Sequence, residues 1–236
     1  MRFMLNFVNT SRVFITFLVV FTCFTACNKQ YNAKDQISEG IIQYDITYSN
    51  RSGQNFPFQL LPKVMELKFN ENYSSYTLED RLGLFSISNI LDFGRCQHIT
   101  LIKVFDKKYV YKGKKGEVSV LFDSSVNYEM KYLEDTARLV GYLCKTANIR
   151  DTQSMKNFEI LYSHAIGSNK PNANTPYEPI EGMLLDFRLV LKNLEMHLKA
   201  KSVEQKNIRD NAFEVPKEYK EISRKKMEEI LTTILP

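Results

Sequence analysis

Short runs in which apolar and polar residues alternate fill most of this sequence and restrict its fold more than any other feature. EGIIQYDITYSN, residues 39–50, places Ile42, Tyr44, Ile46 and Tyr48 on one face with polar residues between them, which is the period of a half-buried β-strand. Strands this close in sequence pair as antiparallel hairpins, so the chain is expected to be mainly β, with one large antiparallel meander. Polar turn residues separate the further runs that we expect to be strands: LLPKVMELKFN, YSSYTLED, LFSISNILDF, HITLIKVF, YVYKG, EVSVLFD, VNYEMKYL, ARLVGYLCKTANI, NFEILYS, MLLDFRLVLK and EMHLKAKSV.

Helical periodicity is clear only at the C-terminal end. SRKKMEEILTTIL, residues 223–235, places Met227, Ile230, Leu231 and Ile234 at the i, i+3, i+4, i+7 spacing of one helix face. This spacing predicts a short amphipathic helix that begins after Ser223 and docks on the sheet through these four residues. One short helix cannot cover so large a sheet, so either the sheet curls on itself or an apolar face stays partly open.

Two long connections interrupt the expected meander. RSGQNFPFQLLP, residues 51–62, is apolar for a loop, whereas AIGSNKPNANTPYEPIEG, residues 165–182, is dominated by Gly, Pro and Asn, as expected of a surface excursion. Loops of this length are often functional. The simpler alternative is that they cross from one sheet edge to another.

The N-terminal segment has the layout of a secretory signal. MRFMLNFVNTSR carries Arg2 and Arg12 and no acid, and VFITFLVVFTCFTA after it has no charge. That apolar run is too short for a comfortable membrane span, which needs about 20 residues. An uncleaved anchor or an ordinary signal peptide are the alternatives to the lipoprotein signal considered next.

The residues around Cys27 resemble a bacterial lipobox. Small residues precede this cysteine in the stretch FTAC, residues 24–27, and the sequence turns polar at Asn28. The resemblance implies that Cys27 is diacylated and that the chain is cleaved before it. Metal ligation by Cys23 and Cys27 is the poorer interpretation, because no His or second Cys pair follows at ligand spacing.

These features divide the chain into a lipoprotein signal peptide (1–26), a lipidated tether (27–38) and a single β-rich domain (39–236). Asn28 is not the Asp that retains lipoproteins in the inner membrane, and no acidic cluster follows Cys27. By this resemblance the protein is expected in the outer membrane, facing the periplasm. The formal net charge of +5 falls to +3 without Arg2 and Arg12, which is too small to favour a nucleic-acid partner.

The two cysteines of the domain allow two interpretations. Cys96 and Cys144 would lie in an oxidising compartment, so a disulfide between them is permitted. Cys144, within LVGYLCKTA, is equally compatible with a buried small apolar side chain.

The sequence contains no constellation typical of catalysis or of metal binding. His98, His164 and His197 are far apart and belong to no ligand motif. Gly113–Gly116 lies between two expected strands, where a hairpin turn is favoured over a phosphate-binding loop. No catalytic residue, metal or cofactor is therefore expected, and the protein is not expected to be an enzyme.

Four stretches in sequence order resemble a family of small lipoproteins of unknown function from Bacteroidetes-type bacteria, related to the GLPGLI proteins: EGIIQYDITY, LVGYLCKTA, PYEPIEGMLLDFRL and NAFEVPKEYKEI. Thr146 stands where a second Lys is usual, and residues 182–184 lack the usual Pro. The resemblance implies a curved antiparallel half-barrel like that of the LolA/LolB-type lipoprotein carriers, with a concave apolar face. It implies no activity and no catalytic residue.

The abundant Tyr and Phe residues are expected first as core, and some as the lining of that face. Phe69, Phe105 and Leu189 are the candidates for an apolar ligand face. A cavity lined by them would favour a lipoprotein that binds a lipid or another apolar ligand, whereas a filled core with an exposed apolar patch would favour an accessory subunit of an envelope assembly. The expected partners are thus the membrane, through acylated Cys27, and either an apolar ligand or an envelope protein.

Overall fold

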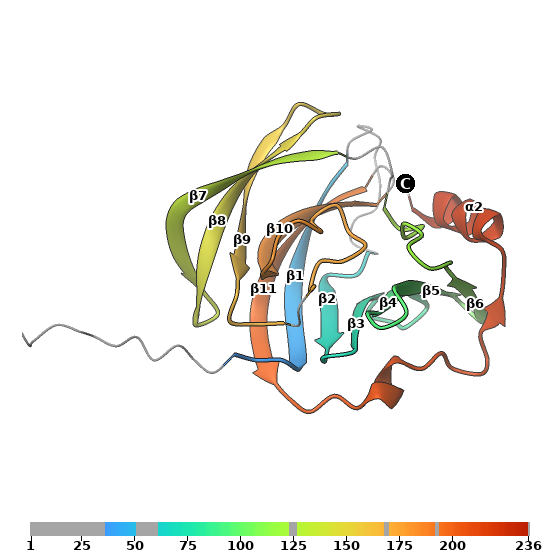
Figure 1. Ribbon diagram of the computed structural model, residues 1–236. Helices are drawn as coiled ribbons and strands as arrows, with labels where there is room; N and C mark the ends of the chain where they lie inside the picture. Colours follow the sequence, from blue (N-terminus) through green and yellow to red (C-terminus); the bar gives the residue numbers. More distant parts are fainter. Residues whose placement is uncertain (1–35, 51–60, 123–126, 168–169, 192–193, 236) are drawn as a thin grey trace, which may run out of the picture. The chain divides into compact units, whose positions relative to one another are not determined.

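The computed structural model describes residues 36–50, 61–122, 127–167, 170–191 and 194–235 (Figure 1). The alternation in the sequence has its expected effect: Ile42, Tyr44 and Ile46 are buried, and the residues between them are exposed. The described residues form the strands β1 (Gly40–Asn50), β2 (Val64–Phe69), β3 (Tyr73–Glu79), β4 (Phe85–Asp92), β5 (Gln97–Val104), β6 (Lys107–Lys112), β7 (Tyr128–Leu139), β8 (Tyr142–Asp151), β9 (Asn157–Ser163), β10 (Met183–Leu191), β11 (Leu194–Gln205) and β12 (Lys220–Glu221), the 3-10 helix η2 (Asp210–Phe213) and the helix α2 (Arg224–Ile234).

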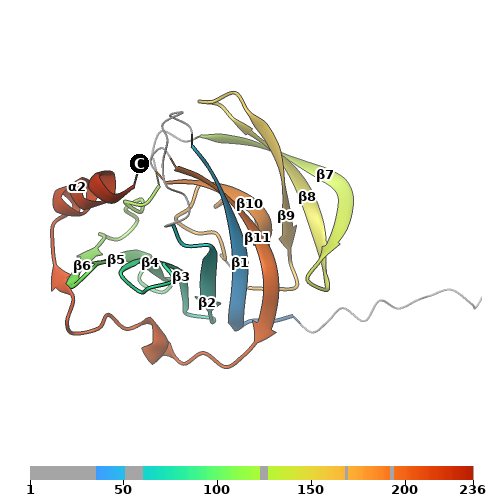
Figure 2. The same cartoon turned by 180° about the vertical axis from the view of Figure 1, so that it is seen from behind.

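These strands form one sheet in the order β12-β6-β5-β4-β3-β2-β1-β11-β10-β9-β8-β7. Strand β1 lies in the middle and joins a first arm, β2 to β6 with β12, to a second arm, β7 to β11. All neighbours are antiparallel except β12, which runs parallel to β6. Figures 1 and 2 show how strongly the sheet curves. The predicted mainly β fold, one large curved antiparallel sheet with a short C-terminal helix, is confirmed.

The two faces of the first arm bury different apolar clusters. Ile87 and Ile102 belong to the main core, which both arms share. On the opposite face, Ile90 and Leu101 are covered by Phe213 and its neighbours in the chain between β11 and β12. The C-terminal segment therefore crosses the outer face of the first arm before α2 begins.

Residues 170–182, which we call the inner loop, do not form the predicted surface excursion. Asn172, Tyr177 and Ile180 are all at most 1% exposed, and Figure 1 shows this segment on the inner side of the sheet. The Asn172 amide donates to the carbonyl oxygens of Ile180 at 2.7 Å and Gly182 at 2.8 Å, so the loop pairs its own buried polar groups.

Residues 117–122, which we call the inner turn, were predicted as a strand and do not form one. Ser119, Val120 and Leu121 are buried in succession, which a half-exposed strand does not allow. Gly116, at φ +71°, turns the chain inward. Strand β6 pairs with β12 at the edge that the missing strand would have taken, and the inner turn covers the sheet instead.

Helix α2 spans Arg224–Ile234, and the Ser223 hydroxyl caps it by accepting a hydrogen bond from the Lys226 backbone N–H at 3.3 Å. Met227 and Leu231 are fully buried, whereas Ile230 and Ile234 are partly buried against the same core. The apolar stripe of the helix therefore lies on the domain, with Met227 and Leu231 deepest.

The expected signal peptide, the lipid attachment at Cys27 and most of the tether lie outside the described residues, as does most of the 51–62 connection. Ile37, placed in the tether by the sequence, is 4% exposed and its N–H donates to the Ala165 carbonyl at 2.9 Å. Residues 34–236 form one compact unit that contains the whole described core. We therefore expect this unit to fold by itself. Among the described ranges, no helix is long and apolar enough to cross a membrane.

Candidate functional site

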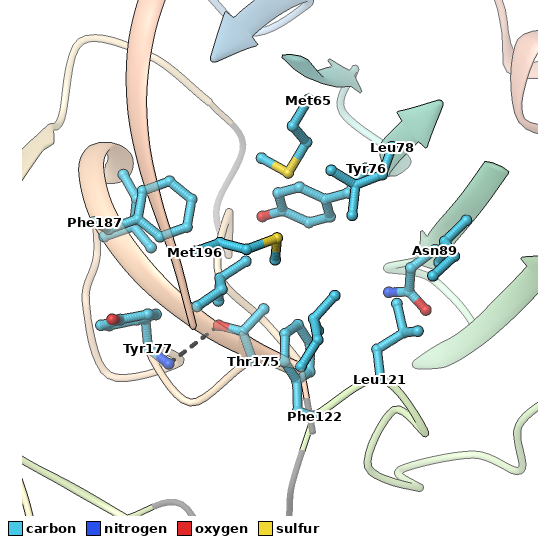
Figure 3. Close-up of a pocket in the computed structure, with 14 residues that line it drawn as sticks. Met65, Tyr76, Leu78, Asn89, Leu121, Phe122, Thr175, Tyr177, Phe187 and Met196 are labelled. Carbon is cyan, nitrogen blue, oxygen red and sulfur yellow. Dashed lines mark hydrogen bonds between the residues drawn. The ribbon is translucent and has the colours of Figure 1, made fainter. Parts of the chain in front are cut away.

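The inner side of the sheet holds an apolar cavity of about 30 Å³ between the two arms. That space holds roughly two water molecules, whereas pockets for small ligands generally measure about 300–1,000 Å³. Figure 3 shows the side chains around it. They are Met65, Tyr76, Leu78, Ile87, Asn89, Leu121, Phe122, Thr175, Tyr177, Leu184, Phe187, Leu189, Leu191 and Met196.

The cavity is small because the chain itself fills the concave face. Met65, Leu78 and Ile87 come from the first arm and Leu184 and Leu189 from the second. The remaining side is made by the inner loop and the inner turn, which together we call the plug. All of the lining residues except Asn89 and Thr175 are aliphatic or aromatic. The plug therefore covers an apolar surface that strands or helices would otherwise have to cover.

Tyrosine hydroxyls connect the inner loop to the sheet. The Tyr177 hydroxyl donates to the Arg188 carbonyl at 2.5 Å, the Tyr132 hydroxyl to the Pro179 carbonyl at 3.0 Å, and the Tyr76 hydroxyl to the Pro171 carbonyl at 3.4 Å. Burial raises the pKa of Tyr177 and of Tyr76 well above the usual value of 10.0. Both therefore remain neutral hydrogen-bond donors at physiological pH.

Asn174 connects the two parts of the plug to each other. Its side-chain oxygen accepts from the Ser119 N–H at 2.8 Å, and its amide donates to the Glu117 carbonyl at 2.9 Å. The residue adopts φ +61°, a conformation that Asn tolerates better than most residues. The inner loop and the inner turn are thus expected to move together.

A buried polar cluster lies behind the inner turn. His98 is 0% exposed, and among the described residues its Nε2 has no hydrogen-bond partner. Its ring occupies the space beside Gly113, where an added Cβ would lie 2.1 Å from the imidazole. Burial lowers the pKa of His98, although the nearby Glu117 carboxylate partly opposes that effect. The neutral imidazole is therefore the form that this site accommodates.

Glu117, the first residue of the inner turn, has a carboxylate with several hydrogen-bond donors around it. It accepts from the Tyr111 hydroxyl at 2.8 Å, from the Lys114 N–H at 2.7 Å and from the Arg224 guanidinium. Burial alone would raise its pKa, but these hydrogen bonds outweigh burial and lower the pKa from 4.5 to about 2. The carboxylate is therefore ionised throughout the physiological range and fixes the inner turn to α2.

The structure brings only one of the predicted apolar face residues to the cavity. Leu189 lines it, whereas Phe69 is buried elsewhere in the core. Phe105 is 66% exposed, so its predicted place on the apolar face is wrong. It occupies the β5–β6 turn at φ +56° and donates its N–H to the Leu84 carbonyl at 2.6 Å, which directs the chain outward.

The disulfide between Cys96 and Cys144 is not formed. Cys96 is an exposed free thiol and Cys144 a buried one. Cys96 immediately precedes β5, and the sheet order places β4, β3, β2, β1, β11, β10 and β9 between β5 and the strand of Cys144, β8. Burial raises the pKa of the Cys144 thiol, in agreement with its alternative interpretation as a small apolar side chain.

The four helix residues Met227, Ile230, Leu231 and Ile234 pack on the core, and none of them lines the cavity. The residues that sequence reasoning missed are Asn174 and Tyr177. Their Pro- and Asn-rich surroundings are typical of an exposed loop, and the only contrary signal was the apolar content of Tyr177 and Ile180.

In the part of the chain that the structure describes, no group of three or more His, Cys, Asp or Glu side chains lies close enough together to hold a metal ion. Comparison with models of known protein families gives no match, and comparison with curated proteins gives none either. The resemblance to the GLPGLI-related lipoproteins stays a prediction.

Proposed function

We propose that this protein is an outer-membrane lipoprotein, anchored through Cys27, which binds the acyl chain of a lipid on its concave face after the plug moves aside. The observation that carries this proposal is the covering of the apolar face. Two irregular segments cover it, and the sheet ends at β7 and β12 without closing on itself. An acyl chain would contact the same side chains that the plug now contacts.

The cavity of about 30 Å³ means that an acyl chain can enter only by displacing the plug. Opening breaks three tyrosine hydrogen bonds, each with a net stability of about 0.5–1.5 kcal/mol, and the contact between Glu117 and Arg224 that holds the inner turn, and it exposes Tyr177. Removal of a strand would break a whole ladder of backbone bonds. The bound chain would replace the apolar contacts that the plug loses, so the two states differ by less than the opening cost alone.

Titration of residues 34–236 with a fluorescent fatty acid, followed by native mass spectrometry, tests the proposal. Saturable uptake is expected. Asn174→Ala, which separates the inner loop from the inner turn, should tighten uptake about 3- to 10-fold, because less free energy is needed to open the plug. Leu189→Asp should abolish uptake by placing a charge on the apolar face.

Met155→Ala, at a position that is 61% exposed, serves as the control and should bind as the parent does. If neither the parent nor Asn174→Ala takes up the probe while both remain folded, the lipid-binding function is wrong.

A second candidate function, a non-catalytic accessory subunit that docks an envelope protein, is favoured by three exposed apolar side chains. Leu82 is 77% exposed, Leu84 44% and Phe105 66%, and the last two are joined through their backbones. Such a group on a surface is typical of a protein contact. Blue native electrophoresis of membranes tests it, because the double variant Leu82→Ser and Phe105→Ser should then migrate as a smaller species than the parent.

A further inference from the structure

A second hollow, distinct from the apolar cavity, lies where β7 departs from regular pairing. Tyr132 pairs with Ala147 and Thr136 with Lys145, so three residues of β7 stand opposite the single residue Thr146. Bulges of this kind occur preferentially at sheet edges, where β7 lies, and beside functional sites, where they redirect side chains. Here the bulge leaves space between β7 and the end of the inner loop.

That space is a cleft of about 530 Å³, within the size range of ligand pockets. It is open to solvent and mixes polar and aromatic side chains, unlike the cavity beneath the plug. Its lining residues are Tyr132, Leu133, Glu134, Thr136, Lys145, Tyr162, His164, Pro179 and Glu181.

Tyr162 is the residue that distinguishes this cleft from a chance depression. It is 4% exposed as a whole, and its hydroxyl, which forms no hydrogen bond to a described residue, is not among the buried unpaired atoms and therefore reaches solvent at the cleft. The ring is held by edge contacts with Tyr132 and His164, at centroid distances of 6.3 and 5.5 Å. Gly182 fits against it so closely that an added Cβ would lie 2.7 Å from the ring. A fixed tyrosine therefore presents a solvent-accessible hydroxyl at the cleft, where a ligand can replace water.

The other polar groups of the cleft are also available to a ligand. Among the described residues, the side chains of Glu134, Lys145 and Glu181 form no hydrogen bond or ion pair, while Tyr132 is tied down through its hydroxyl and keeps its ring half exposed. Carboxylates only accept hydrogen bonds, an ammonium only donates them, and the Tyr162 hydroxyl does both. The matching ligand has many groups that donate and accept.

We infer that this cleft binds a saccharide, with its hydroxyls on Tyr162, Glu181 and Lys145 and one C–H face of the sugar ring against Tyr132. The charges argue for a neutral ligand. A cation would be attracted by Glu134 and Glu181 but repelled by Lys145, and an anion the reverse, so no single charge matches all three groups. A sugar hydroxyl can pair with each of these groups without bringing a charge of its own.

Saturation-transfer NMR and calorimetry on the full chain, in a detergent without a sugar headgroup, test this inference. The probes are N-acetylglucosamine, maltose and cellobiose, with choline and acetate as charged comparisons. At least one sugar should bind saturably in the millimolar range. Tyr162→Phe, which removes only the hydroxyl, should weaken binding about 3- to 10-fold.

Tyr132→Ala, which removes the platform, should weaken binding further than Tyr162→Phe does. The matched control is Tyr109→Phe on β6, outside the cleft, which should bind as the parent does. The inference is overturned if none of the three sugars binds, if only choline or acetate binds, or if Tyr162→Phe binds as tightly as the parent.

Discussion

Arg224, in the first turn of α2, donates hydrogen bonds from its guanidinium to the Glu117 carboxylate and to the Val118 carbonyl of the inner turn. Through this contact the C-terminal helix holds the inner turn, and through Asn174 the inner turn holds the inner loop. The helix therefore closes the concave face indirectly, since it lines no part of the cavity. A substitution at its first turn should reach the plug.

Glu117→Gln should lower the free energy of unfolding at neutral pH by about 1–2 kcal/mol, because it weakens charge-assisted hydrogen bonds at a partly exposed site. The pKa of Glu117 is about 2 in the folded protein against an ordinary 4.5. The parent should therefore lose stability as the pH falls from 4.5 towards 2, since the unfolded chain takes up the proton first. Urea titrations at several pH values in this range should show that the free energy of unfolding falls less with pH for Glu117→Gln than for the parent.

Glu229→Gln is the control for that series. It removes an exposed ion pair with Lys226, in which both side chains are at least half exposed, and such pairs contribute little. Equal losses for Glu117→Gln and Glu229→Gln would contradict the role assigned to Glu117.

His98→Leu should remove a separate pH dependence. The buried imidazole has a pKa below the ordinary 6.5, so the unfolded chain binds its proton at a higher pH than the folded chain does. The contribution of neutral His98 to the free energy of unfolding is complete above pH 6.5 and is lost as the pH falls below that value. As the pH is lowered from neutral, the midpoint temperature of unfolding should fall more steeply for the parent than for His98→Leu. Parallel curves for the two proteins would show that His98 is not the source of this pH dependence.

Leu231 and Ile230 provide a test of how α2 docks. Leu231 is fully buried and Ile230 only partly, so Leu231→Ala should cost about 2–4 kcal/mol and Ile230→Ala about 1 kcal/mol. Chemical unfolding of both variants gives the comparison. An equal cost would mean that the two sides of the helix stripe contribute alike, contrary to the packing described above.

Much of the fold follows from local pattern, and the plug does not. Alternation located the strands because one face of each is buried, as Ile42 and Tyr44 illustrate. The buried run Ser119–Leu121 has strand composition, and only its tertiary contacts show that it turns inward. The inner loop has the composition of a surface loop because Asn172 is needed for its internal hydrogen bonds and Asn174 for those to the inner turn.

The candidate sites were less accessible to sequence reasoning for the same reason. Leu189 was found because it belongs to a regular strand, whereas Phe105 follows a strand at a positive φ, where alternation no longer predicts direction. The cleft around Tyr162 depends on a bulge in β7 and on the far end of the inner loop. Neither the bulge nor the end of the loop produces a periodic pattern of apolar residues that could be recognised in the sequence.

Cys27 is predicted to carry the lipid and to become the first residue of the mature chain. Mass spectrometry of the membrane-extracted protein should find a diacylglyceryl group on an N-terminal peptide that begins at Cys27. Cys27→Ala removes the thiol that would carry the lipid, so the variant should leave the membrane fraction. A Cys27→Ala protein that stayed entirely with membranes through its N-terminus would contradict the prediction. The expected periplasmic orientation is tested separately: efficient digestion of the protein by a protease added to intact cells would contradict it.

Free thiols at Cys96 and Cys144 predict a two-step reaction with a thiol reagent. In the folded fragment of residues 34–236, Cys96 is exposed and should react at once with the reagent. Cys144 is fully buried and its thiol has a raised pKa, so it should react only after unfolding. Cys96→Ser should therefore abolish the fast phase alone. Cys144→Ala should abolish the slow phase alone, and it should lose little stability because an alanine nearly fills the same space. If the native unit instead showed no reactive thiol and released two thiols only after reduction, the two cysteines would be bonded and the strand order between β5 and β8 would be wrong.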